Sequence, residues 1–238
     1  PYPGKELERL WKMTLFNQFH DILPGSCIGA AAADAASDYA QIQAEGNALL
    51  DEALRVLARD SGSNGIAVAN PMNWPRDGVA SIALERLGLA GNAFNVTAPN
   101  GAIVPSQVVD QDGVPTLLFL AKAVPALGVA TYSVAPGASP ADNPLSAGSD
   151  FIENAALRVE IAPNGTFSRV YDKLNAREAL EPGKAGNVLQ AFVVNPGKWE
   201  AWEVDKNFAA EGEDLTGPVT VQVLESGPVR ARVRTIRN

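Results

Sequence analysis

The sequence of this chain changes its pattern of apolar residues near Gly65, and this change indicates the fold class. Before it, apolar residues recur at spacings of three and four, as on one face of a helix. After it, short alternating or β-branched runs are separated by Pro, Gly, Asn and Asp, as in an antiparallel sandwich. With 238 residues the chain can bury a sizeable core. The sequence therefore predicts an α+β chain, with a helical bundle region over residues 1–62 and a β-sandwich domain over residues 63–238.

Two helices are expected in the first part. One covers residues 5–19, and the other follows the Pro24-Gly25-Ser26 break and ends before residues 61–65. Ser26 is the expected N-cap of the second helix, because a short hydroxyl can accept from amides of the first turn. In a pair of helices each helix buries only the face that contacts the other. A third helix is therefore expected to cover the rest of the apolar surface, and no third helical pattern is found in this sequence. We therefore interpret the pair as a two-helix remnant of a three-helix bundle.

Ten strands are expected in the second part, and two of the turns between them carry hairpin signatures. Asn164-Gly165 predicts a hairpin of residues 157–161 with 166–170, and Asp112-Gly113 suggests another, because both dipeptides tolerate positive φ. Residues 136–149 are rich in Pro, Gly and Ser and are interpreted as a surface linker. The expected strands are residues 66–69, 79–84, 103–109, 116–121, 130–134, 156–161, 166–171, 188–193, 219–224 and 229–236.

Charge and residue counts exclude several classes of function. The net charge is -8 and no Lys/Arg cluster is present, so a nucleic-acid partner is not expected. No apolar run is long enough to span a bilayer, so no membrane partner is expected either. No signal-peptide pattern is visible, which leaves localisation open with the cytoplasm preferred. With one Cys and one His, a closed zinc site of nitrogen and sulfur ligands is impossible within this chain.

The only histidine, His20, stands beside Asp21 where the first helix breaks. At a helix end both side chains can face a cleft, and His20 is the one imidazole available for metal or proton chemistry near neutral pH. The alternative is a hydrogen-bonded structural histidine. Cys27 could act as a nucleophile only if a base such as His20 activated it, whereas most free cysteines are inert and apolar. Carboxylates for glycosyl transfer are plentiful, but no pair is singled out by its spacing.

A second cluster, residues 199–205 (WEAWEVD), alternates two tryptophans with acidic residues. Indole rings beside carboxylates suit a sugar, whose C–H face stacks on an aromatic ring while its hydroxyls are hydrogen-bonded. Alternatively, Trp199 and Trp202 are core residues of a strand pair or of a domain seam.

Residues 17–26 (NQFHDILPGS) closely resemble a segment of the α-mannosidases of glycoside hydrolase family 38. Later segments are similar to that family's signatures in the same order, so the resemblance spans nearly the whole chain. Residues 68–77 resemble the opening of the family's C-terminal β domain. The other matching segments are residues 124–128, 172–175 and 199–202.

The resemblance implies a zinc-dependent retaining enzyme whose active site lies between a catalytic barrel and the helical bundle. It implies that His20 is one of four zinc ligands and that Asp21 hydrogen-bonds mannose hydroxyls of an oligosaccharide substrate. The other three ligands, the nucleophile and the acid/base belong to the barrel and cannot be placed on this sequence. The chain is therefore expected to be a fragment that begins within the bundle, stops before the family's usual C-terminus, and is inactive alone.

The competing hypothesis is a non-catalytic carbohydrate-binding or structural β-sandwich with a helical hairpin attached. It would place binding at the tryptophan cluster. In either case the apolar faces of an incomplete bundle are expected to be partly uncovered, so the chain could dimerise through its helices.

Overall fold

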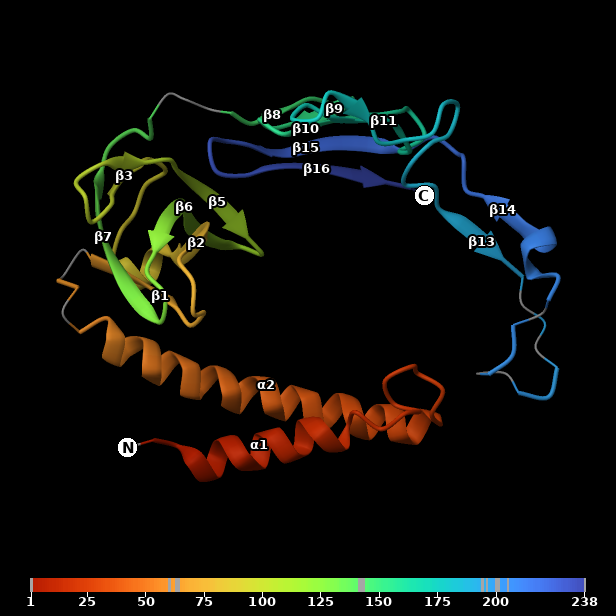
Figure 1. Cartoon of the computed structure of the whole chain (residues 1–238), viewed down its shortest axis with the longest axis horizontal. Helices are drawn as coiled ribbons and strands as arrows, with labels where there is room; N and C mark the ends of the chain where they lie inside the picture. The colour runs from red at the N-terminus through yellow and green to blue at the C-terminus, as the bar shows by residue number, and fades with distance from the viewer. Residues whose placement is uncertain are drawn as a thin grey trace. The chain divides into compact units, whose positions relative to one another are not determined.

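The computed structural model describes residues 2–59, 61–62, 65–140, 144–193, 195, 197–199, 202–204 and 206–237. Two helices are followed by antiparallel sheets, which confirms the predicted α+β class (Figure 1). The chain forms two compact units. One comprises Pro1–Leu57 with Ala191–Glu213, and the other comprises Ala58–Gln190 with Asp214–Asn238. Among the described residues, neither helix is long and apolar enough to cross a membrane.

Helices α1 (Gly4–Phe16) and α2 (Gly29–Leu57) form an antiparallel hairpin. Arg9 forms an ion pair with Glu45 towards one end, and Asn17 donates to Asp38 (2.8 Å) towards the other. Helix α1 ends at Phe16, before the expected boundary at residue 19. Asn17 is its C-cap, and the next N–H, of Gln18, bonds three residues back to the Leu15 carbonyl (3.2 Å) instead of four. Of the described helical residues only Leu10 and Ala35 are fully buried, so much of the apolar surface is exposed.

A sandwich of two sheets forms the main core of the second unit. The first sheet has the order β1 (Gly65–Asn70), β7 (Gly128–Pro136), β3 (Phe94–Thr97) and β4 (Ile103–Val104). The second has the order β2 (Arg76–Ala83), β6 (Val114–Val124) and β5 (Ser106–Gln111), and the 3-10 helix Leu84–Leu87 follows β2. Side chains of both sheets meet in one cluster that includes Val96, Leu117, Phe119 and Tyr132.

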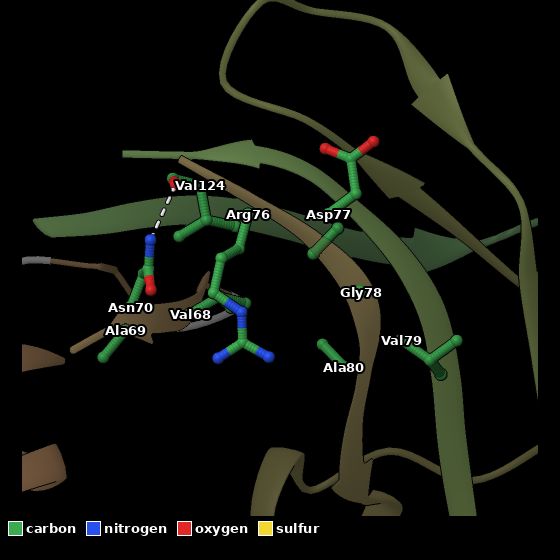
Figure 2. A pocket seen from close by; sticks show the side chains of 10 residues that line it. Val68, Ala69, Asn70, Arg76, Asp77, Gly78, Val79, Ala80 and Val124 are labelled. Carbon is green, nitrogen blue, oxygen red and sulfur yellow. Dashed lines mark hydrogen bonds between the residues drawn. The ribbon is translucent and has the colours of Figure 1, made fainter. Parts of the chain in front are cut away.

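Asn70 fixes one corner of this sandwich. Its Nδ2 donates to the carbonyls of Trp74 (2.8 Å), Val124 (3.1 Å) and Pro125 (3.1 Å), and its Oδ1 accepts from the Met72 N–H (3.0 Å). Figure 2 shows the bond to Val124 beside a cavity of about 180 Å³. Ligand pockets usually enclose about 300–1,000 Å³, so this cavity is small for a sugar chain. We therefore interpret residues 70–74 as a structural motif, in which Asn70 holds the backbone of the turn.

A further sheet of five short strands lies in the same unit. Its order is β12 (Arg177–Glu178), β11 (Phe167–Asp172), β10 (Leu157–Ile161), β9 (Phe151–Glu153) and β8 (Ser146–Ala147). The predicted hairpin through Asn164-Gly165 is confirmed by the pairing of β10 with β11, and Gly165 has a positive φ of 78°. Strand β8 lies inside the expected linker of residues 136–149, so that segment is not wholly linker; residues 141–143 lie outside the described residues.

Two hairpin-like pairs complete the described strands. Strand β15 (Thr220–Ser226) pairs antiparallel with β16 (Ala231–Ile236). Strand β13 (Gln190–Phe192) pairs with β14 (Gly212–Asp214), which follows the 3-10 helix Phe208–Glu211. Phe192 and Phe208 meet edge to face, with ring centroids 5.3 Å apart.

Candidate functional site

The candidate site is the loop between α1 and α2, which begins at a rigid anchor. Asn17 is buried, and its Nδ2 donates both to the Met13 carbonyl (3.0 Å) and to Asp38 of α2 (2.8 Å). The loop then turns through hydrogen bonds from the N–H groups of Ile22 and Leu23 to the Phe19 carbonyl, and Gly25 adopts a positive φ of 79°. The loop therefore has a defined path from one helix to the next.

His20 and Asp21 lie together in this loop with unequal exposure. The His20 side chain is 74% exposed and that of Asp21 is 27% exposed, with His20 Nε2 3.5 Å from Asp21 Oδ2. The His20 ring also packs against Phe19, with centroids 4.2 Å apart. The imidazole is therefore accessible from solvent, while the carboxylate beside it is held in the loop.

Ser26 provides the contact that holds Asp21. Its hydroxyl donates to Asp21 Oδ1 (3.0 Å), and α2 begins three residues later, at Gly29. The prediction that Ser26 caps α2 is therefore wrong, because its hydroxyl is used inside the loop. The sequence offered no signal for this bond beyond the short spacing between Asp21 and Ser26, since the bond depends on the path of the turn between them.

The described residues place limits on other chemistry at the loop. Cys27 is a free, half-buried cysteine, and no hydrogen bond in the described part of the chain joins it to His20. Among the same residues, no group of three or more His, Cys, Asp or Glu side chains is arranged to hold a metal ion. His20 and Asp21 could together supply at most part of a metal site.

The tryptophan cluster lies on a different segment and is exposed. Trp199 is 55% and Trp202 67% exposed, so neither is a core residue of a strand pair in this chain. The N–H groups of Trp202 and Glu203 donate to the Trp199 carbonyl (2.9 and 2.8 Å), and Lys198 Nζ lies 5.0 Å from the Trp199 ring centroid. Glu200, Ala201 and Asp205 of the same motif lie outside the described residues.

The helical hairpin and the antiparallel sheets that follow it each match a known domain. Residues 1–57 match the α-mannosidase middle domain, and residues 152–238 match the glycosyl hydrolases family 38 C-terminal domain. The two matches cover more than half of the chain and lie in the family's order. The chain belongs to glycosyl hydrolase family 38.

Curated relatives agree with this assignment. The chain is 31% identical to α-mannosidase 2C1 of Homo sapiens over 204 residues, which is 85% of this chain and 18% of that protein. The same protein of Mus musculus gives the same identity and coverage. The chain thus spans about a fifth of the length of these relatives.

A solved structure shows the same fold. The crystal structure of an α-mannosidase from Enterococcus faecalis V583 superposes with a TM-score of 0.71 over 99% of this chain and 31% of that chain, at 17% identity. At this identity the likeness speaks for the fold alone.

Proposed function

We propose that this chain is the helical and first β part of a zinc-dependent retaining α-mannosidase that hydrolyses terminal α-mannosyl residues of glycans. Family membership supports the reaction class. The observation that carries the proposal for the site is the exposed His20 imidazole beside the partly buried Asp21 carboxylate. We propose that residues 1–62 form the bundle region and residues 63–238 the β domain.

His20 fits the part of a zinc ligand. An accessible neutral imidazole is a common nitrogen ligand for zinc, and a carboxylate within 3.5 Å of the ring can orient it. A bound zinc ion would polarise oxygen atoms of the substrate as a Lewis acid. Zinc needs three or four protein ligands, so the remaining ligands would come from residues outside this chain.

Asp21 fits the part of a substrate contact. The Ser26 hydroxyl occupies Oδ1 and holds the carboxylate in one orientation, while further lone pairs can accept hydrogen bonds from sugar hydroxyls. A carboxylate positioned before the sugar arrives loses less freedom on binding. The nucleophile and the acid/base, which must flank the scissile bond, would lie outside this chain, so we propose that the chain alone is inactive.

The test compares three variants of the mannosidase polypeptide that contains this chain. His20→Ala is expected to abolish both zinc occupancy and turnover of an aryl α-mannoside. Asp21→Asn is expected to keep zinc while raising KM and lowering kcat, because a sugar contact is weakened. Gln18→Ala, an exposed position of the same loop, is the matched control and should change neither. Full zinc occupancy and full turnover in His20→Ala would refute the assignment of His20.

The exposed tryptophans favour a second candidate function, non-catalytic binding of carbohydrate. Trp199 and Trp202 present indole rings to solvent, and such rings can stack on sugars. A mannose titration of the isolated chain would then change its tryptophan fluorescence, and the change would disappear in Trp199→Phe or Trp202→Phe. The same titration of Trp74→Phe is the control, since Trp74 is an exposed tryptophan outside this cluster.

A further inference from the structure

The tetrapeptide Ala-Pro-Asn-Gly occurs twice in this chain, at residues 98–101 and 162–165. The first copy forms the turn between β3 and β4, and the second forms the turn between β10 and β11. In each turn the glycine N–H donates to the alanine carbonyl (2.9 and 2.8 Å), and the alanine N–H donates to the carbonyl four residues on (2.8 Å in both). The glycines have similar positive φ values, 85° and 78°. The two turns therefore share their sequence and their closing bonds, and they differ chiefly in what surrounds them.

An Asn-Gly pair can react with itself, because glycine has no side chain to obstruct the approach of its nitrogen. That nitrogen attacks Cγ of the asparagine. A bond from the nitrogen to Cγ forms, the Cγ–Nδ2 bond breaks, and the glycine N–H proton leaves to solvent while the amide group departs as ammonia. Water then opens the succinimide ring at either carbonyl and leaves aspartate or isoaspartate. One water is consumed and one ammonia is released, so the reaction needs no oxidant or reductant.

The first turn is open to solvent. Pro99, Asn100 and Gly101 are all exposed, and beyond the chain neighbours no atom lies within 4 Å of the position that a Cβ would take at Gly101. Asn100 Oδ1 accepts from the Ala102 N–H (3.1 Å), which is a bond within the turn itself. In the described part of the chain, the Asn100 side chain is held by no residue from outside this turn.

The second turn is held by additional hydrogen bonds. Asn164 Oδ1 accepts from the Thr166 hydroxyl (2.8 Å) as well as from the Thr166 N–H (3.2 Å). Arg237 Nη2 donates to the Asn164 carbonyl (2.5 Å), and Asn187 Nδ2 donates to the Gly165 carbonyl (3.1 Å). Gly165 is itself buried. The groups that would react are therefore fixed from several directions.

Ring closure must rotate the asparagine side chain and the following peptide bond out of the turn geometry. In the first turn this movement breaks only the hydrogen bonds of the turn. In the second turn it also disturbs the bonds from Thr166, Asn187 and Arg237. Each further hydrogen bond that must break raises the activation barrier. The fold thus leaves one of two identical tetrapeptides reactive and restrains the other.

We propose that Asn100 is a site of spontaneous deamidation in the folded chain, and that the fold protects Asn164 in the same tetrapeptide. The reaction places a new carboxylate at the tip of the β3–β4 hairpin, and the isoaspartate product adds one carbon to the main chain there. This modification site is separate from the proposed mannosidase function and does not depend on it. We make no assignment for the third Asn-Gly pair, residues 64–65, because Asn64 lies outside the described residues.

The test incubates the 238-residue chain in water labelled with heavy oxygen, once folded and once in denaturant. Mass spectrometry follows the peptides that contain residues 98–101 and 162–165, and methylation by an isoaspartate O-methyltransferase with labelled S-adenosylmethionine detects isoaspartate. In the folded chain, Asn100 is expected to react at least about tenfold faster than Asn164. In denaturant the two should react at similar rates, because the tetrapeptides are identical. Asn100→Gln should abolish the mass change of the first peptide.

A pair of variants tests the source of the protection. Thr166→Val with Asn187→Ala removes two of the hydrogen bonds that hold the second turn. The double variant is expected to react about tenfold faster at Asn164 and at an unchanged rate at Asn100. Ser168→Ala is the control and should change neither rate, because it removes a hydroxyl of the same strand that bonds outside the turn.

Equal rates at Asn100 and Asn164 in the folded chain would overturn the proposal, and so would the same ratio of rates in the folded and the denatured chain. An unchanged Asn164 rate in a folded double variant would refute the protection assigned to Thr166 and Asn187. Should the double variant fail to fold, the comparison of the folded and denatured parent chain still decides whether the fold controls the reaction.

Discussion

At the scale of single residues, the loop between the helices exposes one side chain to solvent and holds its neighbour in place. His20 is open to solvent, whereas Asp21 is half-buried and tied to the Ser26 hydroxyl. The anchor of the loop is Asn17, which is buried and joins the end of α1 to Asp38 on α2. The position of His20 and Asp21 therefore depends on Asn17, whose role is structural.

Replacing this anchor should destabilise the helical hairpin. Asn17→Ala removes two side-chain hydrogen bonds, to the Met13 carbonyl and to Asp38, at a buried position. We expect the free energy of unfolding to fall by about 1–3 kcal/mol, the usual cost of leaving buried polar groups unpaired. Urea denaturation followed by helical circular dichroism measures the change. Gln18→Ala, next in sequence but exposed, should stay close to the parent; equal stability of the two variants would contradict this account of Asn17.

At the scale of elements, the five-stranded sheet carries a ladder of alternating charges. Glu153 opposes Arg158 on β10 (2.6 Å), and Arg158 also reaches Glu160 (3.1 Å). The ladder continues through Arg169 of β11 to Glu178 of β12, at 3.5 and 3.1 Å. Residues that lie directly opposite each other on paired strands, or two apart on one strand, share a face of the sheet. These side chains therefore form one polar surface across four strands. Hydrogen bonds from Lys173 and Arg158 lower the pKa of Glu153 below its ordinary value of 4.5.

This lowered pKa predicts a loss of stability in acid. A carboxylate whose pKa is lower in the folded chain contributes stability above its unfolded pKa, and the contribution disappears as the pH falls through the folded pKa. The stability of the unit that contains the ladder should therefore decline as the pH falls below about 4.5. In Glu153→Gln, stability near neutral pH should be lower and the decline shallower. Glu181→Gln, an exposed glutamate outside the ladder, is the control, and an unchanged acid profile in Glu153→Gln would refute the assignment.

The elements that could be predicted from the sequence are those with local signals. Asn164-Gly165 and Asp112-Gly113 each predict a tight turn, and both lie between paired strands; Asp112 and Gly113 have positive φ values of 53° and 85°. Strand β3 was not predicted, although it pairs with β4 across a turn at Asn100-Gly101, where Gly101 has a positive φ of 85°. Its four residues form only a short run, and its other partner, β7, is distant in sequence. The bond of Ser26 to Asp21 could not be predicted either, since it depends on the fold of the loop and not on spacing.

At the scale of the whole molecule, the helical hairpin leaves large apolar side chains uncovered. Trp11 is 63% and Phe16 75% exposed on α1, and Leu15 and Phe19 are also exposed. Exposed apolar patches tend to be covered by association. The expectation of dimerisation through the helices thus has a physical basis in the described surface, and it stays a prediction.

We expect the isolated chain to dimerise at micromolar concentration through this patch. Burial of Trp11 and Leu15 against a second copy removes apolar area from water, which stabilises the dimer. Multi-angle light scattering should give twice the mass of 25.0 kDa, and Trp11→Lys with Leu15→Lys should return it to the monomer value. The control is Val79→Lys with Leu157→Lys, two exposed apolar positions of the β region. A monomeric parent chain would contradict the prediction.

The other zinc ligands and the catalytic carboxylates of the proposed active site could not be assigned to residues of this sequence. Among the described residues, no group of three or more His, Cys, Asp or Glu side chains is arranged to hold a metal ion. His20 and Asp21 drew attention because the first helix breaks beside the only histidine, but their proposed roles rest on the resemblance of residues 17–26 to the family. In the proposed site, the remaining zinc ligands and the catalytic carboxylates come from residues outside this chain.

The zinc content of the isolated 238-residue chain, measured by elemental analysis after dialysis against zinc-free buffer, shows directly whether this chain alone can hold the metal. A single exposed imidazole with one neighbouring carboxylate binds zinc weakly, so we predict far less than one zinc per chain and no hydrolysis of an aryl α-mannoside. The mannosidase polypeptide that contains the chain should retain zinc under the same conditions and lose it in His20→Ala. One tightly held zinc per isolated chain would show that His20 is not one ligand of a site completed by residues outside this chain.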